Sequence, residues 1–320
     1  MAKDDTAPNS IAAGQRAPAF WPLRLAICYG TIVACLPYLT LKALWLFGYS
    51  PGAANAEGAG ALVAPRHVVG NVITAGMELV AIALILALTY PWGQRLPAWL
   101  LATPIWVGVG LLAPILVGLP LGLVAQAFAG GSPAPAENGL DGWVYAIVYG
   151  GFVVQAVGLL LAFVGYALDR WPGAFRIRTP QLKAGGIDLR RVATVAAIII
   201  SGYAALLAAW SVMGQRWGGP AGFETVAQRS FLLATGIIVL AGAIAALCLV
   251  WRWGHGSILA PLVLAWVGMG VAVTSGPTHI ALSNQGEVSL LLVVATVIAV
   301  VSGLTLTGST LRVLARSSAV

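Results

Sequence analysis

Charged side chains are scarce in this sequence, because Asp, Glu, Lys and Arg together make up 8% of its 320 residues. A soluble globular protein carries roughly 25% charged residues. This chain cannot cover a water-facing surface in that way, since 59% of its residues are hydrophobic and its mean hydropathy is +0.91. The composition therefore excludes a water-soluble globular protein and predicts a chain that lies in a lipid bilayer.

Cysteine and histidine are also rare, with three residues of each. Cys28 and Cys35 are seven residues apart, which on one helix separates them by about 10 Å and is too far for a disulfide. The histidines show no spacing that resembles a metal-ligand motif, and His279 is expected at the outer surface rather than inside a helix. We therefore expect no metal, haem or other cofactor.

Eight apolar stretches are long enough to cross a bilayer as helices, which takes about 20 residues each. They cover residues 24–48, 69–90, 98–128, 142–168, 191–213, 230–250, 257–276 and 288–311. Residues 1–20 lack the apolar core of a signal peptide and are expected to form a disordered tail. The sequence thus predicts an all-α polytopic membrane protein with eight transmembrane helices and both termini on one side.

The basic residues indicate which side that is. With the N-terminus inside, 13 of the 17 Lys and Arg residues lie in the inner loops and tails, and the segment 169–191 is the most basic of them. Cytoplasmic loops of membrane proteins are enriched in Lys and Arg. We therefore predict a protein of the cell membrane with cytoplasmic termini, whose net charge of +7 needs no nucleic-acid partner.

Short motifs recur at a nearly constant offset, which predicts an internal repeat. Tyr and Trp stand seven apart in two helices, and a Trp-Val-Gly-x-Gly motif also occurs twice: Tyr38 and Trp45 match Tyr203 and Trp210, and Trp106, Gly108 and Gly110 match Trp266, Gly268 and Gly270. Two four-helix units would then span 21–168 and 192–313, joined by the basic linker 169–191 and followed by a tail at 314–320. Four is even, so the units would share one orientation about an axis along the membrane normal.

Two ionisable residues lie inside predicted spans, where such residues are costly and mark functional sites by default. Lys42 and Glu78 belong to consecutive helices and lie about 9 Å and 13 Å from the same membrane surface. We expect them to form an ion pair that faces the bundle interior, with Asn71 and Thr74 on the same helical face as Glu78. The alternatives are that Lys42 snorkels to the headgroups and that Glu78 is a lone protonated acid.

Three further polar residues are expected to form hydrogen bonds between helices. Gln126 lies near the end of the third span, and Gln155 and Tyr166 share one face of the fourth. Such bonds contribute about 0.6 kcal/mol each on average. A structural role is the simpler reading for all three.

The segment from Lys42 to Gly48 places an ionisable residue, then Trp45, then a glycine at a helix exit. It resembles uncharacterised multi-pass membrane proteins of high-GC Gram-positive bacteria. The resemblance covers about one helix and its exit in each half, and it implies a four-helix unit but no activity. The second half departs from it, because Leu207 stands where the first half has Lys42.

Three classes of function stay open for this membrane protein. The first, which we favour, is an accessory or sensing protein that binds a small or lipidic ligand, or a membrane-protein partner, near Lys42, Trp45 and Glu78. The second is a proton-coupled transporter of a small solute or ion, in which Glu78 carries the proton. The third is an enzyme that modifies lipids, for which the sequence shows no catalytic residues.

Overall fold

The computed structural model describes residues 21–133, 139–283 and 288–318, and within them the chain is all-α. Eight helices are long and apolar enough to cross a membrane, which confirms the eight predicted spans. They are α1 (Trp21–Leu46), α3 (Pro65–Thr89), α4 (Ala98–Ala129), α5 (Gly142–Arg170), α6 (Ile187–Met213), α7 (Val226–Trp251), α8 (Leu259–Leu282) and α9 (Leu290–Ser318). A short helix, α2 (Ala56–Leu62), follows α1. The predicted tail at 1–20 lies outside the described residues.

Helix ends extend past the predicted spans where the first or last turn is polar. α6 begins at Ile187, so its first turn contains Asp188 and two arginines, and hydropathy alone does not register such a turn. α8 continues to Leu282 with Pro277 inside it, which carries the helix beyond the predicted end at 276. The prolines of α4 likewise leave it one continuous helix of 32 residues.

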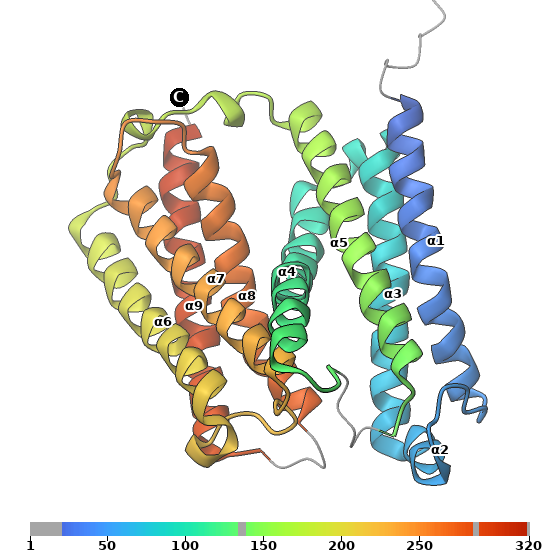
Figure 1. Cartoon of the computed structure of the whole chain (residues 1–320). Coiled ribbons are helices and arrows are strands. Elements are labelled where there is room, and N and C mark those ends of the chain that lie inside the picture. Colours follow the sequence, from blue (N-terminus) through green and yellow to red (C-terminus); the bar gives the residue numbers. More distant parts are fainter. Residues whose placement is uncertain (1–20, 134–138, 284–287, 319–320) are drawn as a thin grey trace, which may run out of the picture.

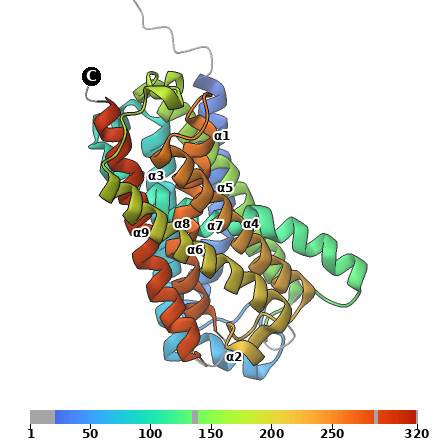
Figure 2. The same ribbon diagram turned by 90° about the vertical axis from the view of Figure 1, so that its left-hand side faces the viewer.

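Different connecting segments lie at the two ends of the molecule (Figures 1 and 2). The segment between α5 and α6, residues 171–186, crosses one end, where α1 begins and α9 finishes; we call it the linker end. Helix α2 lies at the opposite end, which we call the α2 end. The linker packs on the turn between α7 and α8, where the Thr179 amide donates to the Gly256 carbonyl at 2.9 Å.

The helices group by packing as three and five (Figure 1). Helices α1, α3 and α5 pack together, and α6 to α9 form a second bundle. Helix α4, which the sequence assigned to the first four-helix unit, packs chiefly against α7 and α8. Residue 168 therefore does not separate two equal bundles, and the 4+4 repeat stays a prediction.

Glycines explain why α4 joins the second bundle. A Cβ atom on Gly110 would lie 2.5 Å from the Gly270 carbonyl oxygen of α8, and one on Gly122 would lie 2.6 Å from the Ala227 carbonyl oxygen of α7. Only residues without a side chain allow the backbones to approach so closely. A Cβ atom on Gly108 would meet no atom within 4 Å, so Gly108 takes no part in this close approach.

Residues that the predicted repeat makes equivalent have similar contacts. The indole nitrogens of Trp45 and Trp210 each donate to a carbonyl just beyond their own helix, at 3.0 and 2.9 Å. Trp106 and Trp266 meet edge to face across α4 and α8, with ring centroids 6.2 Å apart. The match is partial, because Trp106 Nε1 donates to the Trp266 carbonyl at 2.9 Å whereas Trp266 Nε1 has no partner in the described residues.

The two groups have different interiors. The bundle of α6 to α9 is filled by one large apolar cluster. The α1–α3–α5 group borders two smaller clusters, one at the α2 end around Leu41, Trp45 and Leu62 and one at the linker end around Leu84, Leu88 and Tyr166, to which α4 also contributes. The space between these clusters is occupied by polar side chains.

Candidate functional site

The polar side chains between the two clusters come from three helices, and we call them the polar layer: Cys35, Tyr38 and Lys42 of α1, Asn71, Thr74 and Glu78 of α3, and Gln155 of α5. The two ionisable members are buried, since Lys42 is 8% exposed and Glu78 is 4% exposed. Lys42 thus does not snorkel out to the surface of the protein. The sequence correctly placed both side chains in the bundle interior.

The Lys42 ammonium has a neutral partner. Its Nζ atom donates to Asn71 Oδ1 at 2.8 Å, and it lies 4.7 Å from the centre of the Tyr38 ring and 5.0 Å from that of Trp45. Aromatic faces attract a cation and are worth more when the cation is desolvated. Lys42 is therefore held by an amide oxygen and two rings.

The Glu78 carboxylate has its own partner on α5. Gln155 Nε2 lies 3.0 Å from one carboxylate oxygen and 3.3 Å from the other. The Cys35 thiol lies beside the same carboxylate. Glu78 is therefore buried as the sequence predicted, but its hydrogen-bond partner is Gln155 of α5 and not Lys42.

The predicted direct ion pair between Lys42 and Glu78 is wrong. In the described part of the chain, the ion pairs closer than 4.0 Å are Arg24–Asp169 and Arg191–Asp188. The reason is height along α3: Asn71 and Glu78 are seven residues apart, about 10 Å along the helix axis, and Lys42 lies level with Asn71. The two charges therefore share one interior without touching.

One buried donor at this site has no acceptor. Asn71 is 6% exposed, and its Nδ2 atom has no hydrogen-bond partner. Exchanging the amide oxygen and nitrogen would turn an NH2 group toward the ammonium, so the hydrogen bond from Lys42 determines the orientation of the amide. An unmade hydrogen bond at a buried donor costs about 1–3 kcal/mol. Lys42 and Asn71 thus form a cluster rich in donors and poor in acceptors.

A cover closes the α2 end above this cluster. Trp45 donates its indole N–H to the Pro51 carbonyl at 3.0 Å, and the amide of Asp141 donates to the Gly52 carbonyl at 2.8 Å. Gly58 of α2 packs directly on the backbone of Gly139, where an added Cβ would lie 2.2 Å from the carbonyl oxygen. A ligand that reaches Lys42 from this end must displace part of this cover.

Neither of two small cavities in the described residues lies at the polar layer. Each has a volume of about 20 Å³, enough for one water molecule. One lies between α8 and α9 beside Trp266, and the other lies beside Arg24 and Thr89 near the linker end. Neither cavity therefore contributes to a site at Lys42 or Glu78.

The other predicted polar residues lie away from the layer, apart from Gln155. Gln126 accepts from the Ala227 amide at 3.1 Å and donates to the Gly130 carbonyl at 2.6 Å, which ties the end of α4 to the start of α7. Tyr166 donates to the Gly93 carbonyl at 3.4 Å at the linker end and accepts from Arg170 of its own helix at 2.9 Å. Both residues act as structural contacts between elements.

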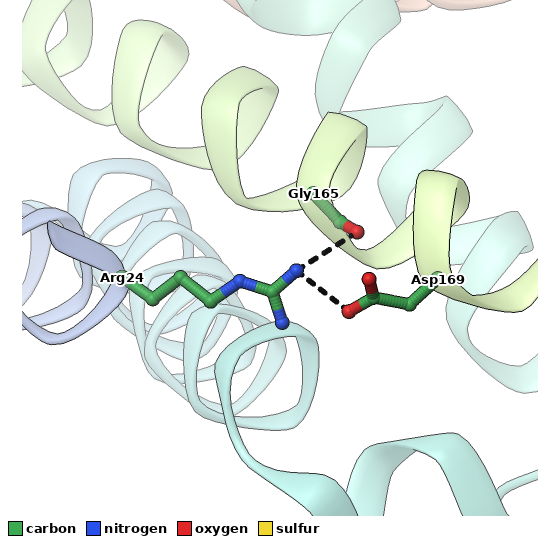
Figure 3. Close-up of polar contacts among 3 residues, drawn as sticks. All are labelled: Arg24, Gly165 and Asp169. Carbon is green, nitrogen blue, oxygen red and sulfur yellow. Dashed lines mark hydrogen bonds and ion pairs between the residues drawn. The ribbon is translucent and has the colours of Figure 1, made fainter. Parts of the chain in front are cut away.

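A second polar contact closes the linker end of the three-helix group (Figure 3). The Arg24 guanidinium forms an ion pair with Asp169 at 2.6 Å and donates to the Gly165 carbonyl at 3.2 Å, joining the start of α1 to the end of α5. The sequence treated Arg24 only as a topology signal. Its pairing with a residue 145 positions later depends on how the helices pack.

The sequence also missed Cys35 and Tyr38 as members of the layer. The signal was present in α1, where polar and sulfur-containing residues recur every three or four positions: Arg24, Cys28, Thr31, Cys35, Tyr38, Lys42 and Trp45. Such spacing places them on one helical face. The stripe goes unrecognised when Cys28 and Cys35 are considered only as disulfide partners.

The expected position of His279 is wrong. It lies within α8 and is 1% exposed, and its ring meets Phe223 edge to face at 5.3 Å. The cause is the underestimated length of α8, which continues past Pro277. Within the residues that the structure describes, no three His, Cys, Asp or Glu side chains lie close enough to hold a metal ion.

No protein-family model matches the chain, and no curated protein or solved structure is similar to it. The resemblance of the Lys42–Gly48 segment to multi-pass membrane proteins of high-GC Gram-positive bacteria stays a prediction. The functional argument therefore depends on the geometry of the polar layer.

Proposed function

We propose that this integral membrane protein is a binding or sensing protein whose ligand places an anionic group at Lys42 and Asn71. The observation that carries the proposal is the buried ammonium of Lys42, which has no carboxylate of the described residues within 4.0 Å and lies beside the unpartnered Nδ2 of Asn71. Lys42 Nζ uses one of its three N–H groups on Asn71 Oδ1 and Asn71 Nδ2 has no acceptor, so a carboxylate or a phosphate would supply acceptors for the remaining donors.

Energetics favour an anion over a neutral ligand. A buried charge is strongly destabilised unless it is paired and hydrogen-bonded, and the amide and the two rings around Lys42 carry no negative charge. An anion would supply that charge and accept hydrogen bonds from both Lys42 Nζ and Asn71 Nδ2. Hydrogen bonds between ions are roughly twice as strong as neutral ones.

The site would be reached from outside the cell. We propose that the linker end faces the cytoplasm, because the segment 169–191 is the most basic inner segment and inner loops are enriched in Lys and Arg. The α2 end and its cover would then face the exterior, in the cell membrane. The ligand source is either the headgroup of an outer-leaflet lipid or a small anion from the medium.

Ligand binding can be tested on the full-length protein purified in a neutral detergent. We expect sulfate, or phosphatidylglycerol added to the micelles, to raise the unfolding midpoint of the wild type. Lys42→Met should lose this gain, and Lys183→Met, which removes an exposed lysine of the linker, should keep it. A ligand at about 100 times its Kd stabilises the folded state by about 2.7 kcal/mol.

The comparison between variants is the essential readout, because sulfate stabilises many proteins by exclusion from their surface. That general effect is equal in all three proteins and cancels. Phosphatidylcholine is the control for the lipid. The proposal is wrong if Lys42→Met gains as much stability as the wild type from both anions.

Transport is the second candidate function, and the position of Glu78 favours it. Glu78 lies in the same interior as Lys42 and about two helical turns from Asn71, so a bound anion and a proton-carrying group would lie in series. Proteoliposomes that contain the protein and respond to an inward proton gradient with uptake of labelled anion would support this reading. Uptake that Glu78→Gln leaves unchanged would exclude it.

A further inference from the structure

We infer that an anion bound at Lys42 is accompanied by one proton, which is taken up by the carboxylate of Glu78. The inference rests on the proposed function and deepens it, because it makes binding proton-coupled. Its basis is the charge balance of the polar layer, which contains one buried lysine and one buried glutamate.

The groups that face Glu78 can be named from each neighbouring helix. Helix α1 presents Cys35, Tyr38 and Lys42, and α5 presents Gln155, with Tyr149 beside Tyr38. Helix α4 has no acidic or basic residue along its whole length. Lys42 is therefore the one fixed positive charge that faces Glu78 from the helices packed around it.

Without a ligand, the ammonium and the carboxylate sum to zero. An added monoanion leaves a net charge of −1 inside a medium of low dielectric constant, which is unfavourable. A proton from water that binds one Glu78 oxygen restores neutrality for a monoanion such as the phosphatidylglycerol headgroup, and it reduces the net charge from −2 to −1 for sulfate. The step forms one O–H bond, breaks no bond within the protein, and consumes one anion and one proton.

Gln155 suits both protonation states of Glu78. Its NH2 group donates to the carboxylate oxygens at 3.0 and 3.3 Å. A neutral carboxyl group has one donor and one acceptor, and the carboxamide of Gln155 offers the complementary acceptor and donor. A basic residue at this position would instead hold Glu78 permanently ionised.

The second bundle shows that these charges are not needed for packing. The predicted repeat makes Leu207 equivalent to Lys42 and makes Val239, Leu240 or Ala241 equivalent to Glu78. All of these are apolar, and Leu207 and Val239 are fully buried in the apolar cluster of α6 to α9. Apolar residues fill the corresponding space there. The charged pair of the first half therefore has a role other than filling the interior.

The test measures the Kd of anions that stay ionised across the pH range, namely sulfate and phosphatidylglycerol, between about pH 6 and about pH 8. Coupling to one proton makes wild-type binding tighter by up to about tenfold for each unit that the pH falls. Glu78→Gln, which mimics the protonated acid, should bind with little pH dependence. Glu224→Gln, a change at an exposed glutamate, should behave as the wild type.

A second measurement needs no variant. Addition of sulfate to wild-type protein in weak buffer should remove about one proton per bound anion, detected with a pH dye. The carbonyl stretch of a protonated carboxylic acid should appear in the infrared difference spectrum. This readout decides the question even if Glu78→Gln does not fold.

The outcomes separate the two proposals. Lys42-dependent binding without proton uptake, and with the same pH dependence in Glu78→Gln, overturns the proton coupling and leaves the proposed function intact. Absence of any Lys42-dependent binding overturns both. A coupled response to sulfate identifies a free anion as the ligand, and a coupled response to phosphatidylglycerol alone identifies a lipid headgroup.

Discussion

Replacement of Asn71 by leucine should destabilise the protein by about 2–4 kcal/mol. Asn71 Oδ1 is the acceptor for the Lys42 ammonium at 2.8 Å, and a hydrogen bond to a charged group contributes about 1.5–3 kcal/mol. Removing one partner of a buried charge costs about 3–5 kcal/mol. The loss of the unpartnered Nδ2 donor offsets about 1 kcal/mol of this.

A double variant, Lys42→Met with Asn71→Leu, tests whether the two side chains stabilise each other. Lys42→Met alone removes a buried charge that costs about 2.5–3.5 kcal/mol on insertion scales and leaves the Asn71 amide unsatisfied at a cost of about 1–3 kcal/mol, so its net effect should lie between a loss of about 0.5 kcal/mol and a gain of about 2.5 kcal/mol. Lys42→Met combined with Asn71→Leu leaves no orphaned polar group, and it should recover most of the stability lost in Asn71→Leu. The two changes are therefore strongly non-additive.

The assay is the free energy of unfolding of each variant in lipid bicelles. Ser275→Ala is the matched control, because it removes a buried but neutral hydrogen bond. The hydroxyl oxygens of Ser275 and Tyr203 are 3.1 Å apart, and the loss of this bond should lower the free energy of unfolding by about 0.6 kcal/mol. The hydrogen bond between Lys42 and Asn71 is refuted if Asn71→Leu lowers the free energy of unfolding by no more than Ser275→Ala does, and if adding Lys42→Met to Asn71→Leu recovers no stability.

Two further predictions concern packing and topology. Gly110→Ala should cost about 1–3 kcal/mol, because its Cβ would lie 2.5 Å from the Gly270 carbonyl oxygen, whereas Gly108→Ala, with no atom within 4 Å, should be neutral or gain about 0.5–1 kcal/mol. Unfolding midpoints decide this, and equal effects would contradict the packing of α4 on α8. A membrane-impermeant thiol reagent applied to intact cells should label Gly60→Cys and should label Ala184→Cys only after lysis. Labelling in the reverse order would invert the proposed orientation.

The sequence predicted features that depend on a single segment of the chain, and it did not predict contacts between segments that are far apart in the chain. A run of about 20 apolar residues predicts a spanning helix by itself, and all eight helices were found in this way. A lysine or a glutamate within such a run is also a local signal, because its cost does not depend on which helix lies opposite. Lys42 and Glu78 were therefore recognised as buried and functional candidates.

The hydrogen-bond partners of Lys42 and Glu78 could not be predicted in the same way. Whether Lys42 meets Glu78 or Asn71 depends on the relative height and rotation of α1 and α3, and one helical turn of about 5.4 Å is enough to change the partner. Gln155 was assigned to its helix face, but nothing in its own segment indicates that the face meets Glu78.

The sequence by itself determined the eight spanning helices and the two ionisable residues in the interior, because each depends on the transfer of a short segment from water to lipid. Only the tertiary structure decided that α4 joins α7 and α8 and that Lys42 binds Asn71. These depend on glycines that let particular backbones approach, and on side chains that are far apart in the chain and meet at one height.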